Sequence, residues 1–84
     1  MTKLSTIRQQ IDTIDVHLLS LIQERTALAD NVVQAKKEMG KAIFDAEREQ
    51  QVLERLKASS DLSSECIEGV WKSLFTESRK RQGE

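Results

Sequence analysis

Apolar residues recur through the first half of the chain at alternating spacings of four and three residues. The series covers about ten helical turns, and one cation, Arg25, interrupts it. This spacing is typical of one face of an α-helix. A cation on such a face must be paired or must meet an anion, so Arg25 is a candidate functional residue. The series consists of Ile7, Ile11, Ile14, Leu18, Leu21, Arg25, Leu28, Val32, Ala35 and Met39.

The pattern predicts a first helix over residues 4–39. Gly40 is suited to end it, because glycine readily adopts the left-handed conformation. Such a helix is roughly 54 Å long, whereas a compact globule of this chain length measures only about 30 Å across. The chain cannot cover so long a helix by itself. We therefore expect two copies to form an intertwined homodimer.

Two shorter helices are predicted over residues 46–58 and 64–81. Asp45 and Ser63 are suited to cap their amino ends. Gly69 lies inside the third helix, where glycine is destabilising unless another backbone packs closely against it. The predicted fold is therefore one all-α domain over residues 1–84, a helical bundle of three helices with a very long first helix.

Composition limits the class of protein further. Hydrophobic residues make up 38% and charged residues 32% of the 84 residues, without any proline, which is typical of a soluble helical domain. The net charge of −1 gives no global basic field for nucleic acid. No long uncharged apolar run or signal-peptide core is present. The single Cys66 cannot form an internal disulfide. We expect a cytoplasmic protein with neither a membrane nor a nucleic acid as partner.

The cations of the first helix have a defined geometry. Arg25 and Lys36 are eleven residues apart, so their side chains emerge within about 20° of each other and roughly 16 Å apart along the axis. Two long side chains at this spacing can hold opposite ends of a small ligand. Arg8 lies about 25 Å along the helix from Arg25. It could reach the same ligand only from an antiparallel second copy.

Each of these residues also has an ordinary structural explanation. An inward arginine such as Arg25 often packs its stem and pairs its head at the rim, and Lys36 resembles any solvated lysine. Glu49 in a first helical turn stabilises the helix dipole. His17 has no second ligand at metal spacing, so no metal site is expected.

A binding site is favoured because polar residues on all three predicted helices continue the inward-facing stripes. A structural coiled coil would have Leu, Ile or Ala at these positions. A cation-rich cavity in a chain of net charge −1 implies a small polyanionic ligand. The residues concerned are Arg25, Lys36, Arg48, Glu49, Ser78 and Gln82.

Several short segments, taken in their order along the chain, together form a pattern that is typical of a protein family. They are IRQQIDTID at 7–15, LLSLIQER at 18–25, Leu-Ala at 28–29, Ala-Lys at 35–36, IFDAERE at 43–49, and Glu77, Ser78 and Gln82 in the third helix. In this order and spacing they resemble the chorismate mutases of the all-helical class over nearly the whole chain. Relatives commonly have proline where this chain has Ala46, a difference that removes no functional group.

The resemblance implies an isomerase that rearranges chorismate to prephenate, the branch step toward phenylalanine and tyrosine. This pericyclic, Claisen-type rearrangement requires no cofactor, nucleophile or metal. The enzyme must fold a flexible dianion into a near-attack shape and stabilise charge on its ether oxygen. By the same resemblance, Arg25 would bind one carboxylate of the substrate and Arg8 from the partner subunit would bind the other. Ser78 would donate a hydrogen bond to a carboxylate.

The resemblance also implies which residues act on the reacting atoms. Lys36 and Gln82 would donate to the ether oxygen from its two sides. Glu49 would accept a hydrogen bond from the ring hydroxyl, helped by the backbone around Asp45. Arg48 would orient Glu49 and add positive potential.

Two other functions remain open from the sequence. An isochorismate-pyruvate lyase on the same scaffold would use similar cations, although a carboxylate at Glu49 fits the ring hydroxyl of chorismate better. A helical dimerisation module would bind no ligand, and Arg25→Leu would then stabilise it or be neutral.

Overall fold

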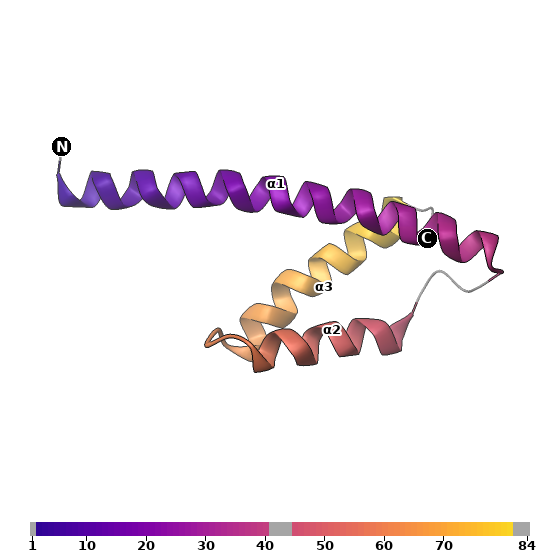
Figure 1. Ribbon diagram of the computed structural model, residues 1–84. Helices are drawn as coiled ribbons and strands as arrows, with labels where there is room; N and C mark the ends of the chain where they lie inside the picture. The colour runs from indigo at the N-terminus through magenta and orange to yellow at the C-terminus, as the bar shows by residue number, and fades with distance from the viewer. Residues whose placement is uncertain (1, 41–44, 82–84) are drawn as a thin grey trace.

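The computed structural model describes residues 2–40 and 45–81 and contains three α-helices within these ranges. Helix α1 spans Lys3–Glu38, α2 spans Ala46–Ala58 and α3 spans Ser64–Arg81 (Figure 1). Each helix begins and ends within one residue of the bounds predicted from the sequence. The predicted all-α class is confirmed.

Polar side chains cap the amino ends of the three helices. The side-chain oxygens of Thr2, Asp45 and Ser63 each accept a hydrogen bond from the backbone N–H three residues further on, at 3.0, 3.0 and 3.1 Å. These bonds satisfy N–H groups that have no partner inside the helix. After α1 the chain turns at Gly40, whose φ of 70° lies in the left-handed region. The boundaries therefore follow from local side-chain chemistry.

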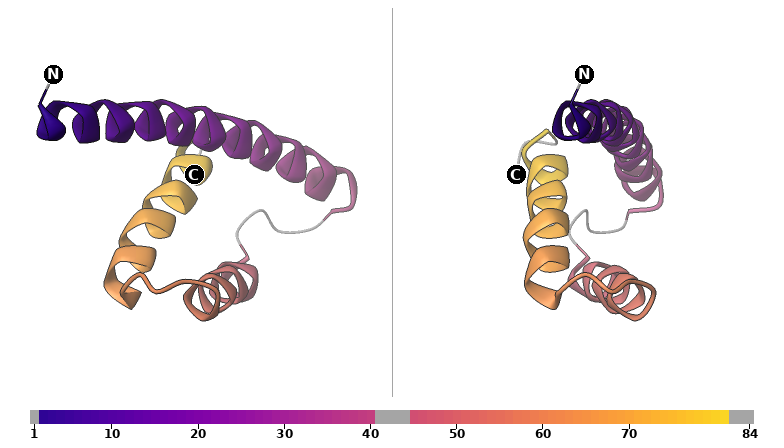
Figure 2. Two further views of the ribbon diagram at one scale, coloured as in Figure 1. Left: turned by 60° about the vertical axis from the view of Figure 1, so that its left-hand side comes forward. Right: turned by 90° about the vertical axis from the view of Figure 1, so that its left-hand side faces the viewer.

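Helix α3 connects the other two helices in space. It packs against α2 near its beginning and against the carboxyl-terminal half of α1 near its end (Figure 1). The same arrangement is visible from two further directions in Figure 2. The amino-terminal half of α1 projects beyond both partners, which gives the molecule extents of 57 × 24 × 18 Å. A pocket lies where α1, the start of α2 and the end of α3 face one another.

The core within the described residues is small and lies between α2 and α3. It consists of Val52, Leu53, Ile67 and Phe75, with Leu56 and Trp71 packed against it. By contrast, the apolar stripe of α1 is uncovered, with its large side chains between 43% and 61% exposed. This stripe comprises Leu4, Ile7, Ile11, Ile14, Leu18, Leu21, Leu28 and Val32. Within the described ranges, no helix is both long and apolar enough to span a membrane.

Candidate active site

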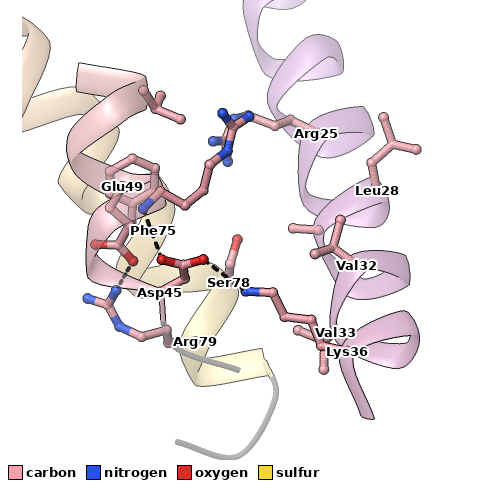
Figure 3. A pocket seen from close by; sticks show the side chains of 13 residues that line it. Arg25, Leu28, Val32, Val33, Lys36, Asp45, Glu49, Phe75, Ser78 and Arg79 are labelled. Atoms are coloured by element: carbon pink, nitrogen blue, oxygen red, sulfur yellow. Dashed lines mark hydrogen bonds and ion pairs between the residues drawn. The ribbon is translucent and has the colours of Figure 1, made fainter. Parts of the chain in front are cut away.

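The pocket between the three helices has a volume of about 340 Å³ (Figure 3). Its apolar lining is formed by Leu28, Ala29, Val32 and Val33 of α1, Val52 of α2 and Phe75 of α3. The polar lining contains six of the residues selected from the sequence, brought together from all three helices. These are Arg25, Lys36, Asp45, Arg48, Glu49 and Ser78.

The pocket carries an excess of positive charge. Four cationic side chains line it against two carboxylates, which leaves two positive charges in a chain whose net charge is −1. Low-dielectric walls strengthen the field of such a cluster. The pocket is therefore suited to a small dianion. The cations are Arg25, Lys36, Arg48 and Arg79, and the carboxylates are Asp45 and Glu49.

Arg25 is partly buried, and its guanidinium carbon lies 5.6 Å from the centroid of the Phe75 ring. The pKa of Arg25 is lowered from its usual value because burial removes water from the guanidinium and because the positive charge of Arg48 opposes it. Arginine nevertheless stays protonated in proteins. A bound anion would compensate for both unfavourable effects, so the site favours an anionic ligand at this point.

Asp45 links the start of α2 to the end of α1. Its Oδ1 accepts the cap hydrogen bond from the backbone N–H of Arg48, and its Oδ2 lies 3.8 Å from Nζ of Lys36. A charge-assisted hydrogen bond would be about 2.7–2.9 Å long. The contact with Lys36 is therefore a long ion pair and not a direct hydrogen bond.

Glu49 forms an ion pair with Arg79 of α3 (Figure 3). Arg79 was not selected from the sequence, although a signal for it was present. It follows Phe75 by four residues and Ser78 by one, and residues four apart share a helix face. Extending the apolar face of α3 by one turn would have placed Arg79 in the pocket.

The hydroxyl of Ser78 is buried and has no hydrogen-bond partner among the described residues. A buried hydroxyl is normally satisfied, so this one can bind a ligand in the pocket. Arg8, which was predicted to bind the substrate from a partner subunit, does not line the pocket of this chain. Arg8 is exposed on the projecting part of α1, and Gln82 lies outside the described residues.

The fold and the site together define a class of protein: an all-helical domain with a small, cation-lined pocket between its three helices. Residues 7–83 match the family model described as chorismate mutase type II. Since this match covers most of the chain, the protein belongs to that family. The resemblance stated from the sequence segments is thereby confirmed.

Similar proteins of known name agree with this assignment. A chorismate mutase from Methanocaldococcus jannaschii is 44% identical over 55 residues, which are 66% of this chain and 56% of that protein. The match thus spans little more than half the length of this relative.

Two solved structures of chorismate mutase from Thermus thermophilus are also similar. Form I has a TM-score of 0.85 at 25% identity over 92% of this chain and 99% of that chain. Form II has a TM-score of 0.87 at 25% identity over 94% of this chain and 92% of that chain.

Proposed function

We propose that this protein is a chorismate mutase, an isomerase that converts chorismate to prephenate in phenylalanine and tyrosine biosynthesis. The observation that carries the proposal is the pocket of about 340 Å³ with two more cations than carboxylates. Chorismate is a small dianion, and electrostatic complementarity of this kind gives specificity. Family membership and the names of the similar proteins support the same activity.

The reaction needs no covalent help from the protein. One C–O bond breaks while one C–C bond forms within the same molecule, so the site must hold a chair-like near-attack shape and stabilise charge on the ether oxygen. Lys36 is proposed to donate to that oxygen, with Gln82 donating from its other side. Because this contact strengthens as charge develops, it lowers the barrier more than it tightens binding.

The two ends of the substrate require separate anchors. Arg25 is proposed to bind one carboxylate, because the guanidinium can present two parallel N–H donors to it. The unpartnered hydroxyl of Ser78 adds a further donor. Glu49 is proposed to accept from the ring hydroxyl near the backbone of Asp45, while Arg48 orients Glu49 and adds positive potential.

A second copy of the chain is proposed to complete the site. The stripe along α1 leaves eight large apolar side chains between 43% and 61% exposed, which a partner helix would bury. Arg8 lies about 25 Å along α1 from Arg25. In an antiparallel pair, Arg8 of the other subunit would enter the pocket and bind the second carboxylate.

Turnover of chorismate by the purified protein tests the proposed activity. Loss of the ring-diene absorbance should be saturable in the wild type and absent in Arg25→Ala. A matched control, Arg55→Ala, removes an exposed cation of α2 that does not line the pocket and should retain activity. Mass spectrometry should find a product of unchanged mass. Release of pyruvate would indicate a lyase instead, and a folded protein without turnover would contradict the proposal.

Mixing two inactive variants tests the shared site. Arg8→Ala and Arg25→Ala should each be inactive alone. After subunit exchange, half of the dimers are mixed, and each mixed dimer holds one site with both arginines intact. Activity should therefore return to about a quarter of the wild-type value. If mixing restores no activity although exchange is verified by mass spectrometry, Arg8 does not act across the interface.

A further inference from the structure

The ion pair between Glu49 and Arg79 joins α2 to α3 at the wall of the pocket (Figure 3). Nη1 of Arg79 donates to Oε2 of Glu49, and the two residues are 30 positions apart in the sequence. The side chain of Arg79 is 31% exposed and that of Glu49 is 27% exposed. Partial burial screens the pair less than a surface pair, so it holds the carboxylate in a defined position.

Glu49 needs such a partner because of its surroundings. It shares the pocket with Arg25 and Lys36, which are proposed to bind the substrate. A carboxylate that turned toward one of these cations would neutralise it and occupy its donors. Pairing with Arg79 draws Glu49 toward α3 instead. The cations facing the pocket then keep their charge for the dianion.

We propose that Arg79 is a positioning residue of the active site. It holds Oε2 of Glu49, and this carboxylate presents its second oxygen, Oε1, to the hydroxyl of the substrate. The inference deepens the proposed function and rests on it. Arg79 itself is not required to touch the substrate.

The competing explanation is that the ion pair merely fastens α3 to α2. These helices already share the apolar core of Val52, Leu53, Ile67 and Phe75. Arg79 lies beyond this core, one turn after Phe75. The core therefore supplies the attachment of the helices, and the ion pair adds the orientation of one carboxylate.

A double-mutant cycle separates positioning from attachment. The kcat and KM for chorismate are measured for the wild type, Arg79→Gln, Glu49→Gln and the double variant, with Tm as a check of folding. Arg79→Gln should lower kcat/KM roughly tenfold when Glu49 is present. In the Glu49→Gln background the same substitution should change kcat/KM by less than about twofold, because the carboxylate that Arg79 positions is gone.

Two further variants serve as controls. Arg79→Lys should stay within about threefold of the wild type, because a lysine ammonium keeps the positive charge and can still donate to Oε2 of Glu49. Lys80→Gln removes the next cation of α3, which is exposed and does not line the pocket, and should retain wild-type activity.

Several outcomes would overturn the inference. An equal loss in both backgrounds would mean that Arg79 acts independently of Glu49, as a direct substrate contact would. A lower Tm with unchanged kcat/KM would mean that the pair only fastens the helices. These two outcomes can be observed only if the wild type is active. A wild type without turnover would overturn the proposed function, and this inference with it.

Discussion

The guanidinium of Arg25 lies over the ring of Phe75, with 5.6 Å between Cζ and the ring centroid. A cation above an aromatic face is attracted by the negative potential of the ring. Phe75 is only 7% exposed and belongs to the core between α2 and α3. The core thereby fixes the ring, and the ring helps to fix the cation that faces the pocket.

Phe75→Leu should raise the KM for chorismate roughly three- to fivefold while changing kcat little. Arg25 loses a favourable contact, but its proposed carboxylate is bound equally in the ground state and the transition state. The free energy of unfolding should fall by about 1–2 kcal/mol. Leu56→Val, which trims the same core outside the pocket lining, should lower stability without the change in KM. An unchanged KM in Phe75→Leu would show that the contact does not position Arg25.

Arg25→Leu should separate stability from function. Burial and the charge of Arg48 already lower the pKa of Arg25, so the charged side chain is disfavoured in the folded protein. A leucine, which fits the apolar stripe of α1, should leave the free energy of unfolding within about 1 kcal/mol of the wild type or increase it. The kcat/KM for chorismate should fall at least about a hundredfold, because one carboxylate of the substrate loses its anchor. Denaturant unfolding measures the stability, and steady-state kinetics measure the activity. Wild-type activity in Arg25→Leu would contradict the proposal that Arg25 binds a carboxylate of the substrate.

Glu68 should make the stability of α3 on α2 depend on pH. Nζ of Lys57 in α2 and Nζ of Lys72 in α3 each lie 3.1 Å from its carboxylate oxygens. Hydrogen bonds to Lys72 and Lys57, and then their charges, lower the pKa of Glu68. A lowered pKa stabilises the folded state above the unfolded value of about 4.3, and this contribution is lost as the pH falls through the folded pKa.

Glu68→Gln should therefore lower Tm slightly at pH 7, and the difference from the wild type should be smaller at about pH 3, below the unfolded pKa. Thermal unfolding at the two pH values measures this effect. The exposed Glu77→Gln on the same helix is a control that lacks the two lysine contacts. A difference that is the same at both pH values would mean that the charge of Glu68 is not its cause.

The helices could be predicted because their signals are local. The alternating spacing along α1 and the caps at Asp45 and Ser63 involve residues within one or two turns of each other. Contacts between helices depend on how the helices pack together, so they are harder to predict from the sequence. Gly69 illustrates this limit. The sequence suggested that another backbone packs closely against it, yet among the described residues outside its own stretch of α3 nothing lies within 4 Å of the position where its Cβ would be.

The candidate site shows the same distinction. Arg25 and Lys36 could be related from the sequence because a single helix fixes their spacing. Their meeting with Glu49 and Ser78 was an inference from convergent faces, and the pocket contains all four. Arg79 was missed because a cation near the carboxyl end of a helix usually serves the helix dipole. Its pairing with Glu49 depends on how α3 crosses α2, which residue spacing within one helix does not determine.

Lys36→Ala should lower kcat about a hundredfold or more and change KM only a few-fold. Lys36 lines the pocket with its Nζ 3.8 Å from Oδ2 of Asp45, and it is proposed to donate to the ether oxygen as the C–O bond breaks. Its contact strengthens with the charge that develops there, so its removal raises the barrier more than it weakens binding. Lys37→Ala removes the adjacent exposed cation, which does not line the pocket, and should leave kcat unchanged. If Lys36→Ala instead raised KM at constant kcat, Lys36 would bind the ground state only, and the charge on the ether oxygen would need another donor.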